Sequence, residues 1–332
     1  MSAPEAIQAF WDWWPFARSH IEIAIAAGDL GGLPTQVTPR VQAIHAGLQW
    51  ELAPGTRAAN QLCLSGAGDL RLRPFSEAWV LAAPPADATW EFHAARQPSA
   101  KDKLTIGGFE LHAEEARIDI APDEARERLD VVLHHPEFAR MPKGLPGQAG
   151  FLFLDAALGE DGVERWLGTV DFVGSVPPES MPLAELRRAV EWLAKRSTGA
   201  RWAIFRGSAP DGRPYTATVN QALKRIDHLF YDYHLEARLP IPGGGLPNDE
   251  QSDRLNQIED SLGEALGPEA RGFARVTLPG VRVLHYYARD GAAAWDRMEA
   301  WAAGQDPAPG LFWHEDTEWR YYREGLYRPP DA

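Results

Sequence analysis

The order of hydrophobic periods in the C-terminal part of the chain constrains the fold more than any other feature. Apolar residues alternate in four short segments and recur every three or four residues in two longer ones, which predicts strands and helices respectively. The expected elements are a strand at 229–238, a helix at 249–266, strands at 271–278 and 281–288, a helix at about 291–303 and a strand at 310–315. This order is that of the ferredoxin-like split unit, so we expect a ferredoxin-like α+β domain.

A hairpin and a helix precede this unit. Two strand-like runs within 201–220 flank Asp211-Gly212, and Asp-Gly is a strong signal for a tight hairpin turn. A helix is expected at 182–197, after a proline-containing linker candidate at 175–180. A chain of 332 residues exceeds the usual size of one domain. We therefore expect an α+β protein of two domains, 1–175 and 181–332.

The first domain is expected to combine helices with short strands. Its first helix has an apolar stripe that includes Ile7, Phe10 and Trp14. Pro15 lacks an N–H and is expected to kink this helix or to mark a new start near Phe16. Further helices are expected at about 35–46, 74–83 and in the first part of 150–174, and strands at 48–53, 60–66, 88–97, 103–111, 116–121, 129–134 and 167–173.

Charge and cysteine content exclude several classes of function. The formal net charge is −14, with 47 acids against 33 bases, so nucleic acid is not an expected partner. Cys63 is the single cysteine, which excludes an intrachain disulfide and a cysteine-rich zinc site, and its strand-like setting predicts burial. No apolar run is long enough for a membrane span. We expect a cytoplasmic protein that binds no membrane and no cofactor.

The glycine-rich stretch from Gly243 leads into the helix at 249–266. Asn248 and Gln251 match a capping box, and acids in the first turn suit the positive end of the helix dipole. No Gly-Lys-Ser/Thr follows the glycines, so this is not a phosphate-binding loop. Gln251 and Glu259 border the apolar face, where polar side chains need partners.

Three stretches resemble a known bacterial family. They are "LPNDEQSDRLNQIEDSLGEAL", "RGFARVTLPGVRVLHYYARD" and "DTEWRYYREGLYRP". They are similar to the family catalogued as domain of unknown function 695, over residues of about 200–330. The matching positions are Leu246, Pro247, Glu250, Leu255, Ile258, Glu259, Asp260, Leu262, Gly280, Arg282, Tyr286, Tyr287, Trp319 and Tyr322. The family usually has Asp-Gly before Leu-Pro, where this chain has Gly244-Gly245.

The resemblance also has weaker extensions. "FWDWW" near the start and "LDAALGE" at 154–160 resemble an uncharacterised region that often precedes this family's domain. Some members are similar to the RraB-type regulator of ribonuclease E, a ferredoxin-like protein that acts by binding an enzyme. That similarity implies a fold more than an activity.

Histidines and acids are not arranged in a recognisable metal motif. Adjacent strand residues face opposite ways, so His134 and His135 are interpreted as a surface turn. The cluster His314, Glu315 and Asp316 is interpreted as a solvated loop or a cap. His285 alternates with Val283 and Tyr287 on one side of a strand, and we interpret it as a hydrogen-bonded sheet histidine. No metal site is expected.

Two sets of aromatic residues stand out. Core packing is expected for the first set: Phe10, Trp11, Trp13, Trp14 and Phe16. The second set is Phe312, Trp313, Trp319, Tyr321, Tyr322 and Tyr327. It is expected either to clasp the two domains together or to form a patch that binds a partner.

These observations favour a non-catalytic protein-binding or regulatory module, with another protein as partner and an open oligomeric state. The alternative is an unrecognised hydrolase or metal-dependent enzyme that uses Glu259 with His285 or Arg282. The candidate functional residues are Gln251, Glu259, Arg282, His285, Trp319 and Tyr322. We also expect an ion pair between Glu259 and Arg282 that ties the helix to the facing strand.

Overall fold

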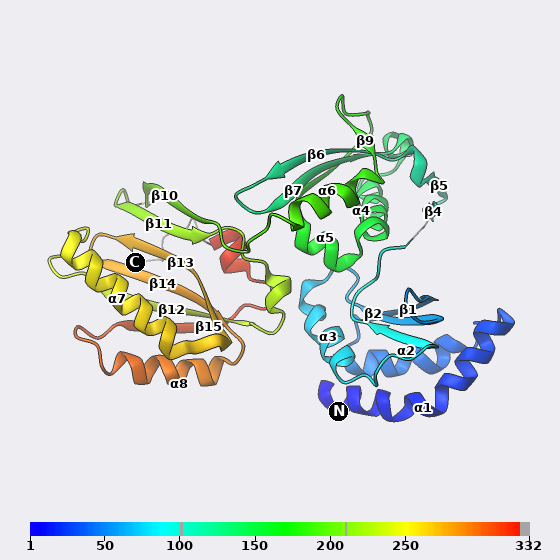
Figure 1. Cartoon of the computed structure of the whole chain (residues 1–332), viewed down its shortest axis with the longest axis horizontal. Coiled ribbons are helices and arrows are strands. Elements are labelled where there is room, and N and C mark those ends of the chain that lie inside the picture. Colours follow the sequence, from blue (N-terminus) through cyan, green and yellow to red (C-terminus); the bar gives the residue numbers. More distant parts are fainter. Residues whose placement is uncertain (100–101, 210, 326–332) are drawn as a thin grey trace. The chain divides into compact units, whose positions relative to one another are not determined.

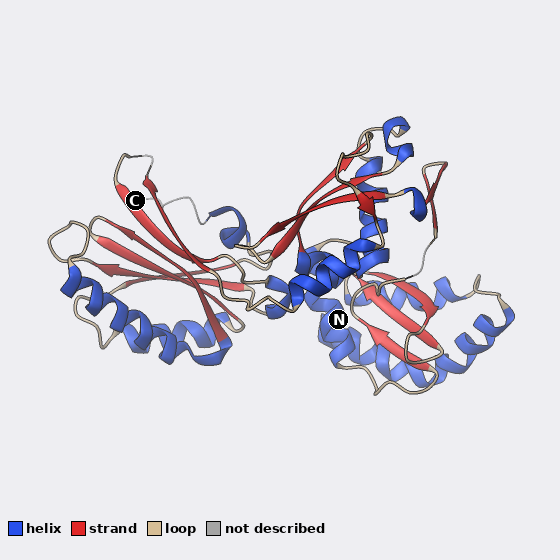
Figure 2. Cartoon of the chain, turned by 45° about the horizontal axis from the view of Figure 1, so that its top comes forward, coloured by secondary structure: helices blue, strands red, loops and turns tan. Residues whose placement is uncertain are grey.

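The computed structural model describes residues 1–99, 102–209 and 211–325. The chain forms two compact units of mixed α+β structure (Figures 1 and 2). Unit 1 comprises Met1–Pro122 and Leu129–Ala194, and unit 2 comprises Asp123–Arg128 and the chain from Lys195 onward. Among the helices of the described residues, none has the length and apolar character that a membrane span requires.

The division between the units falls after Ala194, whereas the sequence placed it at 175–181. Helix α6 (Glu185–Ala194) accounts for the difference. Its buried residues Leu186, Val190 and Leu193 pack into a core of unit 1. The proline-containing segment at 175–180 is therefore a loop inside unit 1.

One core of unit 1 lies between three helices and a small sheet. Its elements are α1 (Ala3–Ala27), α2 (Leu33–Ile44), β1 (Gln49–Pro54), β2 (Asn60–Ser65), η1 (Leu70–Leu72), α3 (Arg73–Leu81) and β3 (Trp90–His93). The sheet order is β1-β2-β3, with β1 antiparallel and β3 parallel to β2. The rings of Trp14, Trp79 and Trp90 are fully buried in this core, and Cys63 is buried as expected.

The first helix does not restart at Pro15. Helix α1 runs through the proline, so the expected new start near Phe16 is wrong. Four of the five residues of the first aromatic set pack in or against the core, but Phe16 is 79% exposed. Its position on the helix turns it away from the apolar stripe.

The other core of unit 1 contains the remaining strands. Its elements are β4 (Lys103–Ile106), β5 (Phe109–His112), η2 (Ala113–Glu115), β6 (Arg117–Asp123), β7 (Arg128–His134), η3 (Pro136–Arg140), α4 (Leu145–Leu158), α5 (Glu160–Trp166), β8 (Leu167–Val173), β9 (Met181–Pro182) and α6. The expected strand at 103–111 is two strands, because Gly107-Gly108 supplies a positive-φ turn. His134 and His135 are buried and bond to backbone carbonyls, so the expected surface turn is wrong.

Unit 2 is built on a six-stranded antiparallel sheet. Its elements are β10 (Trp202–Ser208), β11 (Pro214–Asn220), η4 (Arg225–His228), β12 (Tyr233–Pro240), α7 (Asp249–Leu266), η5 (Gly267–Glu269), β13 (Ala270–Leu278), β14 (Val281–Ala288), α8 (Gly291–Ala302), β15 (Gly310–Glu315) and the π-helix η6 (Tyr321–Gly325). The strand order is β10-β11-β13-β14-β12-β15. The expected elements of this region are all present, and the capping box of Asn248 and Gln251 is confirmed.

The two faces of this sheet are covered differently. Helices α7 and α8 lie together on one face, the helix face, and enclose an apolar core (Figure 1). The other face, called here the second face, packs against aromatic residues that follow β15. Those residues include Trp319, Tyr321 and Tyr322, and Tyr327 lies outside the described residues. The second face carries the polar groups considered below.

Glu127 organises the beginning of unit 2. Its carboxylate accepts hydrogen bonds from Ser197 Oγ at 2.5 Å, Thr198 N at 2.9 Å and Gly199 N at 2.9 Å, and it pairs with Arg201 at 2.9 Å. Burial acts to raise the pKa of Glu127, but these hydrogen bonds lower it to about 2. The ionised carboxylate therefore stabilises the segment that leads into β10.

We predict that Glu127→Gln lowers the free energy of unfolding by on the order of 2–3 kcal/mol at pH 7. Because the pKa of Glu127 is lowered in the folded state, its contribution is present above pH 4.5 and is lost as the pH falls toward 2. Urea unfolding of the wild type and the variant between pH 7 and pH 3 measures this contribution to the free energy of unfolding. Glu124→Gln, an exposed neighbour on the same turn, is the control. Equal unfolding midpoints for the two variants would show that Glu127 contributes nothing.

Candidate functional site

Three buried polar side chains meet on the second face of the sheet. His234 and Glu236 are two residues apart on β12, so both point to the same face. His285 on β14 is the cross-strand partner of Glu236. One potential ligand atom from each residue lies within 4.8 Å of the others. We call His234, Glu236 and His285 the histidine cluster.

The two imidazoles of the cluster contact each other directly. Nε2 of His234 lies 3.2 Å from Nδ1 of His285. Their exposed fractions are 0% and 1%. Nδ1 of His234 and Nε2 of His285 are buried and have no hydrogen-bond partner among the described residues. Such unpartnered buried atoms are rare in folded proteins, and each one calls for a physical explanation.

Burial determines the protonation state of the cluster. It lowers the pKa of His234 well below its usual value, and the neighbouring histidines His285 and His314 add to the effect. It also lowers the pKa of His285, with Arg238 acting in the same direction. Both rings are therefore neutral at neutral pH and each retains one lone pair. Glu236 is paired with Arg238 at 3.1 Å.

The segment after β15 covers the cluster. The Tyr321 ring stacks on His234 with 4.1 Å between ring centroids. Trp319 stacks on Tyr287 at 4.2 Å, with 2° between the ring planes, and its Nε1 donates to the Tyr231 carbonyl oxygen at 2.7 Å. The segment is thus anchored on either side of the cluster and closes it off from solvent.

Asp316 fixes the backbone of the covering segment. Its carboxylate accepts hydrogen bonds from the Tyr287 hydroxyl at 2.6 Å, from Arg320 N at 2.8 Å and from Tyr321 N at 2.9 Å. Asp316 therefore caps the turn, in agreement with the expectation of a solvated loop or a cap. His314 is exposed on β15 beside His234, with 4.8 Å between ring centroids.

The expected ion pair between Glu259 and Arg282 is wrong. Glu259 pairs with Arg275 on β13 at 3.0 Å. Arg282 on β14 donates to Asn256 Oδ1 at 2.9 Å and to Thr277 Oγ1 at 3.1 Å. The cross-strand register sets Thr277 directly opposite Arg282. Arg275 is therefore the arginine that meets Glu259 on α7.

The remaining candidate residues separate into two groups. Gln251 is structural, since it completes the helix cap and donates to the Pro242 carbonyl oxygen at 3.0 Å. Tyr322 donates to the Asn220 carbonyl oxygen at 2.8 Å, and with Trp319 it lies on the second face, as does His285. Glu259 belongs to the helix face, so the structure does not bring it together with His285.

His234 and Glu236 were not among the residues expected from the sequence, although a signal for them was present. "His-Leu-Glu" at 234–236 lies in a segment predicted to be a strand. Alternation then puts His234 and Glu236 on one face, which is a spacing suited to two ligands. What periodicity could not supply was the pairing of β12 with β14, which brings His285 beside them.

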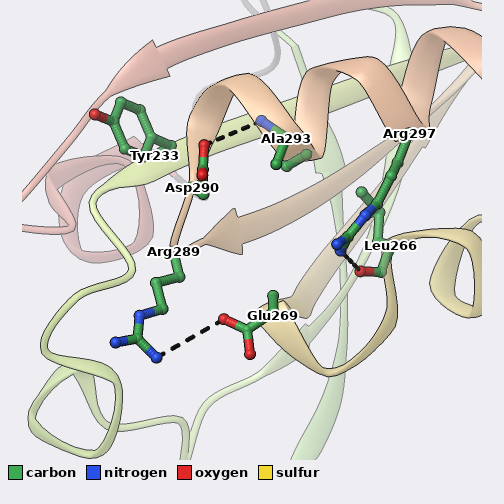
Figure 3. Close-up of a pocket in the computed structure, with 8 residues that line it drawn as sticks. Tyr233, Leu266, Glu269, Arg289, Asp290, Ala293 and Arg297 are labelled. Atoms are coloured by element: carbon green, nitrogen blue, oxygen red, sulfur yellow. Dashed lines mark hydrogen bonds and ion pairs between the residues drawn. The ribbon is translucent and has the colours of Figure 1, made fainter.

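A separate cavity of about 440 Å³ lies near the start of α8 (Figure 3). Its charged groups are engaged with neighbouring groups. Arg289 faces Glu269 at 3.9 Å, Arg297 donates to the Leu266 carbonyl oxygen at 2.9 Å, and Asp290 caps α8. The charges that line the cavity are therefore balanced.

Unit 2 is thus an antiparallel α+β domain with helices on one face and a covered histidine cluster on the other. Residues 200–327 match the model of a family of unknown function, DUF695. The match confirms the family resemblance of the C-terminal part and spans the whole histidine cluster. No curated protein and no solved structure matches the chain.

Asp232, just before β12, gives a pH-dependent test of this region. Burial raises its pKa to about 6, Arg225 partly offsets this, and Glu315 adds to it. A carboxyl group whose pKa is raised on folding stabilises the protein at low pH and loses that contribution as the pH rises through 6. We predict that Asp232→Asn is more stable than the wild type at pH 8, by on the order of 1–2 kcal/mol after solvent screening.

Thermal unfolding at pH 4, 6 and 8 measures this difference. The advantage of Asp232→Asn should shrink as the pH falls from 6 to 4, because the folded wild type takes up a proton on Asp232 over this range and no longer carries a buried charge. Asp253→Asn changes an exposed carboxylate on α7 and serves as the control. If Asp232→Asn is less stable than the wild type at pH 8, the raised pKa of Asp232 is contradicted.

Proposed function

We propose that unit 2 is a non-catalytic binding module that pairs with an extended segment of a partner protein along strand β10. The supporting observation concerns large hydrophobic side chains. Five of them are exposed in the described part of unit 2, and four of these lie on the two edge strands of the sheet. They are Trp202 and Ile204 on β10 and Phe312 and Trp313 on β15.

Strand β10 is the better candidate of the two edges. On β15, Phe312 lies under the Arg238 guanidinium at 4.2 Å, and Trp313 packs against the Tyr233 ring at 5.5 Å. On β10, Trp202 is 54% exposed and Ile204 is 64% exposed. Neither has a ring contact or a place in an apolar cluster among the described residues. These two side chains are therefore available to a partner.

The backbone of β10 supports the same proposal. Among the described strands, β10 pairs with β11 alone, so one row of its N–H and C=O groups faces outward. Edge strands of natural proteins are commonly protected by proline, lysine or bulges, and β10 contains neither proline nor lysine. A partner strand would gain main-chain hydrogen bonds and contacts with alternate side chains.

The chemistry of β10 restricts the partner. Trp202, Ile204 and Arg206 alternate on one face of the strand and are all exposed. A complementary segment is extended, carries apolar residues at alternate positions and has an acidic residue opposite Arg206. We infer that binding of this kind regulates the partner in the cytoplasm, as the resemblance of some family members to an RraB-type regulator implies.

We also infer that β12 to β15, with α7 and α8, form a ferredoxin-like arrangement to which β10 and β11 are added. The strand order β13-β14-β12-β15 and the position of both helices on one face support this inference. The added hairpin moves the free edge of the sheet from β13 to β10. The alternative is an enzyme that uses Glu259 with His285 or Arg282. The geometry disfavours it, because Glu259 and His285 lie on opposite faces of the sheet and Glu259 pairs with Arg275 instead of Arg282.

We predict that Ile204→Lys and Trp202→Lys abolish partner capture while the fold is retained, since a charge on an edge strand opposes strand pairing. Tagged wild-type chain and variants are incubated with a native lysate, and bound proteins are identified by mass spectrometry. Exposed surface changes of this kind alter the free energy of unfolding by about 0.5 kcal/mol or less. Phe16→Lys, at another exposed aromatic, is the matched control.

A photo-cross-linking amino acid at position 204 then identifies the contact. The proposal predicts cross-links to an extended segment of the captured protein, and none from position 16. It is contradicted if the wild type captures no protein reproducibly, or if capture persists in both β10 variants.

A further inference from the structure

We propose that His234, His285 and Glu236 bind one divalent first-row transition-metal ion, with Zn²⁺ as the representative. This inference is independent of partner binding at β10, because it concerns the second face of the sheet and not its edge. No metal site was expected from the sequence. The proposal instead rests on the ligand types, on their spacing and on their burial.

The ligand types suit such an ion. Imidazole nitrogens and carboxylate oxygens are common Zn²⁺ ligands, and two histidines with one acidic residue form several known kinds of site. Mg²⁺ and Ca²⁺ prefer oxygen ligands throughout, so a set with two imidazoles disfavours them. All three side chains come from neighbouring strands of one sheet, a rigid support for a ligand set.

The spacing also fits one ion. Two ligands of a tetrahedral Zn²⁺ site, each about 2.0–2.1 Å from the ion, lie roughly 3.3–3.4 Å apart. Nε2 of His234 and Nδ1 of His285 are 3.2 Å apart. All three potential ligand atoms lie within 4.8 Å of one another. Small rotations of the side chains are therefore sufficient to direct them toward a common point.

Packing alone does not require three buried polar side chains at one point of the sheet. Leu or Phe side chains would fill the same buried volume without leaving polar atoms unsatisfied. In the metal-free protein, the facing nitrogens of His234 and His285 share one proton. When a metal binds, that proton moves to the outer nitrogen of the same ring. Both facing lone pairs then bind the ion, and the histidines release no net proton.

Arg238 lies behind Glu236, the third proposed ligand, and forms hydrogen bonds with it. Its Nε and Nη2 donate to Glu236 Oε2 at 3.3 Å and 3.1 Å. Hydrogen bonds of this kind orient ligating carboxylates, and their loss usually weakens metal binding. The other oxygen of Glu236 is left for the ion. The set then contributes one negative charge and two neutral rings.

Tyr321 controls access to the cluster. Its ring stacks on His234 at 4.1 Å and lies 5.1 Å from the His285 ring. Movement of the Tyr321 ring would open a route for an ion to the cluster. Tyr321→Ala should therefore speed both uptake and release of the ion without removing a ligand.

Isothermal titration of the chelator-treated full chain with Zn²⁺ tests the proposal. We expect one Zn²⁺ per chain, and at least about tenfold weaker binding for Glu236→Gln and for His285→Gln. The control is His228→Gln, which alters a half-buried histidine that stacks on Trp319 outside the cluster. Its affinity should match that of the wild type. Circular dichroism establishes that each variant is folded.

Co²⁺ provides a second measurement that needs no variant. Co²⁺ bound to the wild-type chain by imidazole and carboxylate ligands should give visible absorption bands that excess Zn²⁺ removes. The proposal is overturned if the wild type binds neither ion, or if Glu236→Gln and His285→Gln bind Zn²⁺ as tightly as His228→Gln does. If a histidine variant fails to fold, Glu236→Gln and the Co²⁺ spectrum of the wild type decide whether the cluster binds a metal ion.

Discussion

The stacking of Trp319 on Tyr287 is the contact on which the second face of the sheet depends. Trp319 is fully buried although its backbone has a φ of 55°, in a region that bulky residues rarely adopt. The burial of its ring and the hydrogen bond to the Tyr231 carbonyl oxygen offset that strain. The same contact holds Tyr321 over His234. Without it, the aromatic and polar groups of this face would be open to water.

The sheet of unit 2 has two separate features, an uncovered edge and an enclosed polar cluster. The edge strand β10 offers unpaired backbone groups and exposed apolar side chains, whereas the histidine cluster is enclosed between the sheet and the covering segment. Burying neutral polar groups is costly unless they find partners. The uncovered edge and the enclosed cluster are therefore features that packing alone does not explain, and each suggests a distinct interaction.

Much of unit 2 could be predicted because the relevant signals are local. The capping box of Asn248 and Gln251 and the apolar stripe of α7 depend on residues a few positions apart. The predicted ion pair between Glu259 and Arg282 was wrong because the choice between Arg275 and Arg282 depends on the stagger of β13 against α7. Strand pairing likewise brings His285 to His234 and Glu236, residues distant in sequence. The boundary between the units was predicted too early in the chain because α6 packs against unit 1. That packing is a long-range contact, which local sequence patterns do not reveal.

The central claim is that the histidine cluster is a ligand set for a metal ion. Anomalous diffraction from crystals grown with Zn²⁺, measured on both sides of the zinc absorption edge, tests it most directly. The account predicts one dominant anomalous peak in unit 2, bonded to His234, His285 and Glu236 at about 2.0–2.2 Å. A cluster with no anomalous density, in crystals that bind Zn²⁺ elsewhere on the chain, would contradict it.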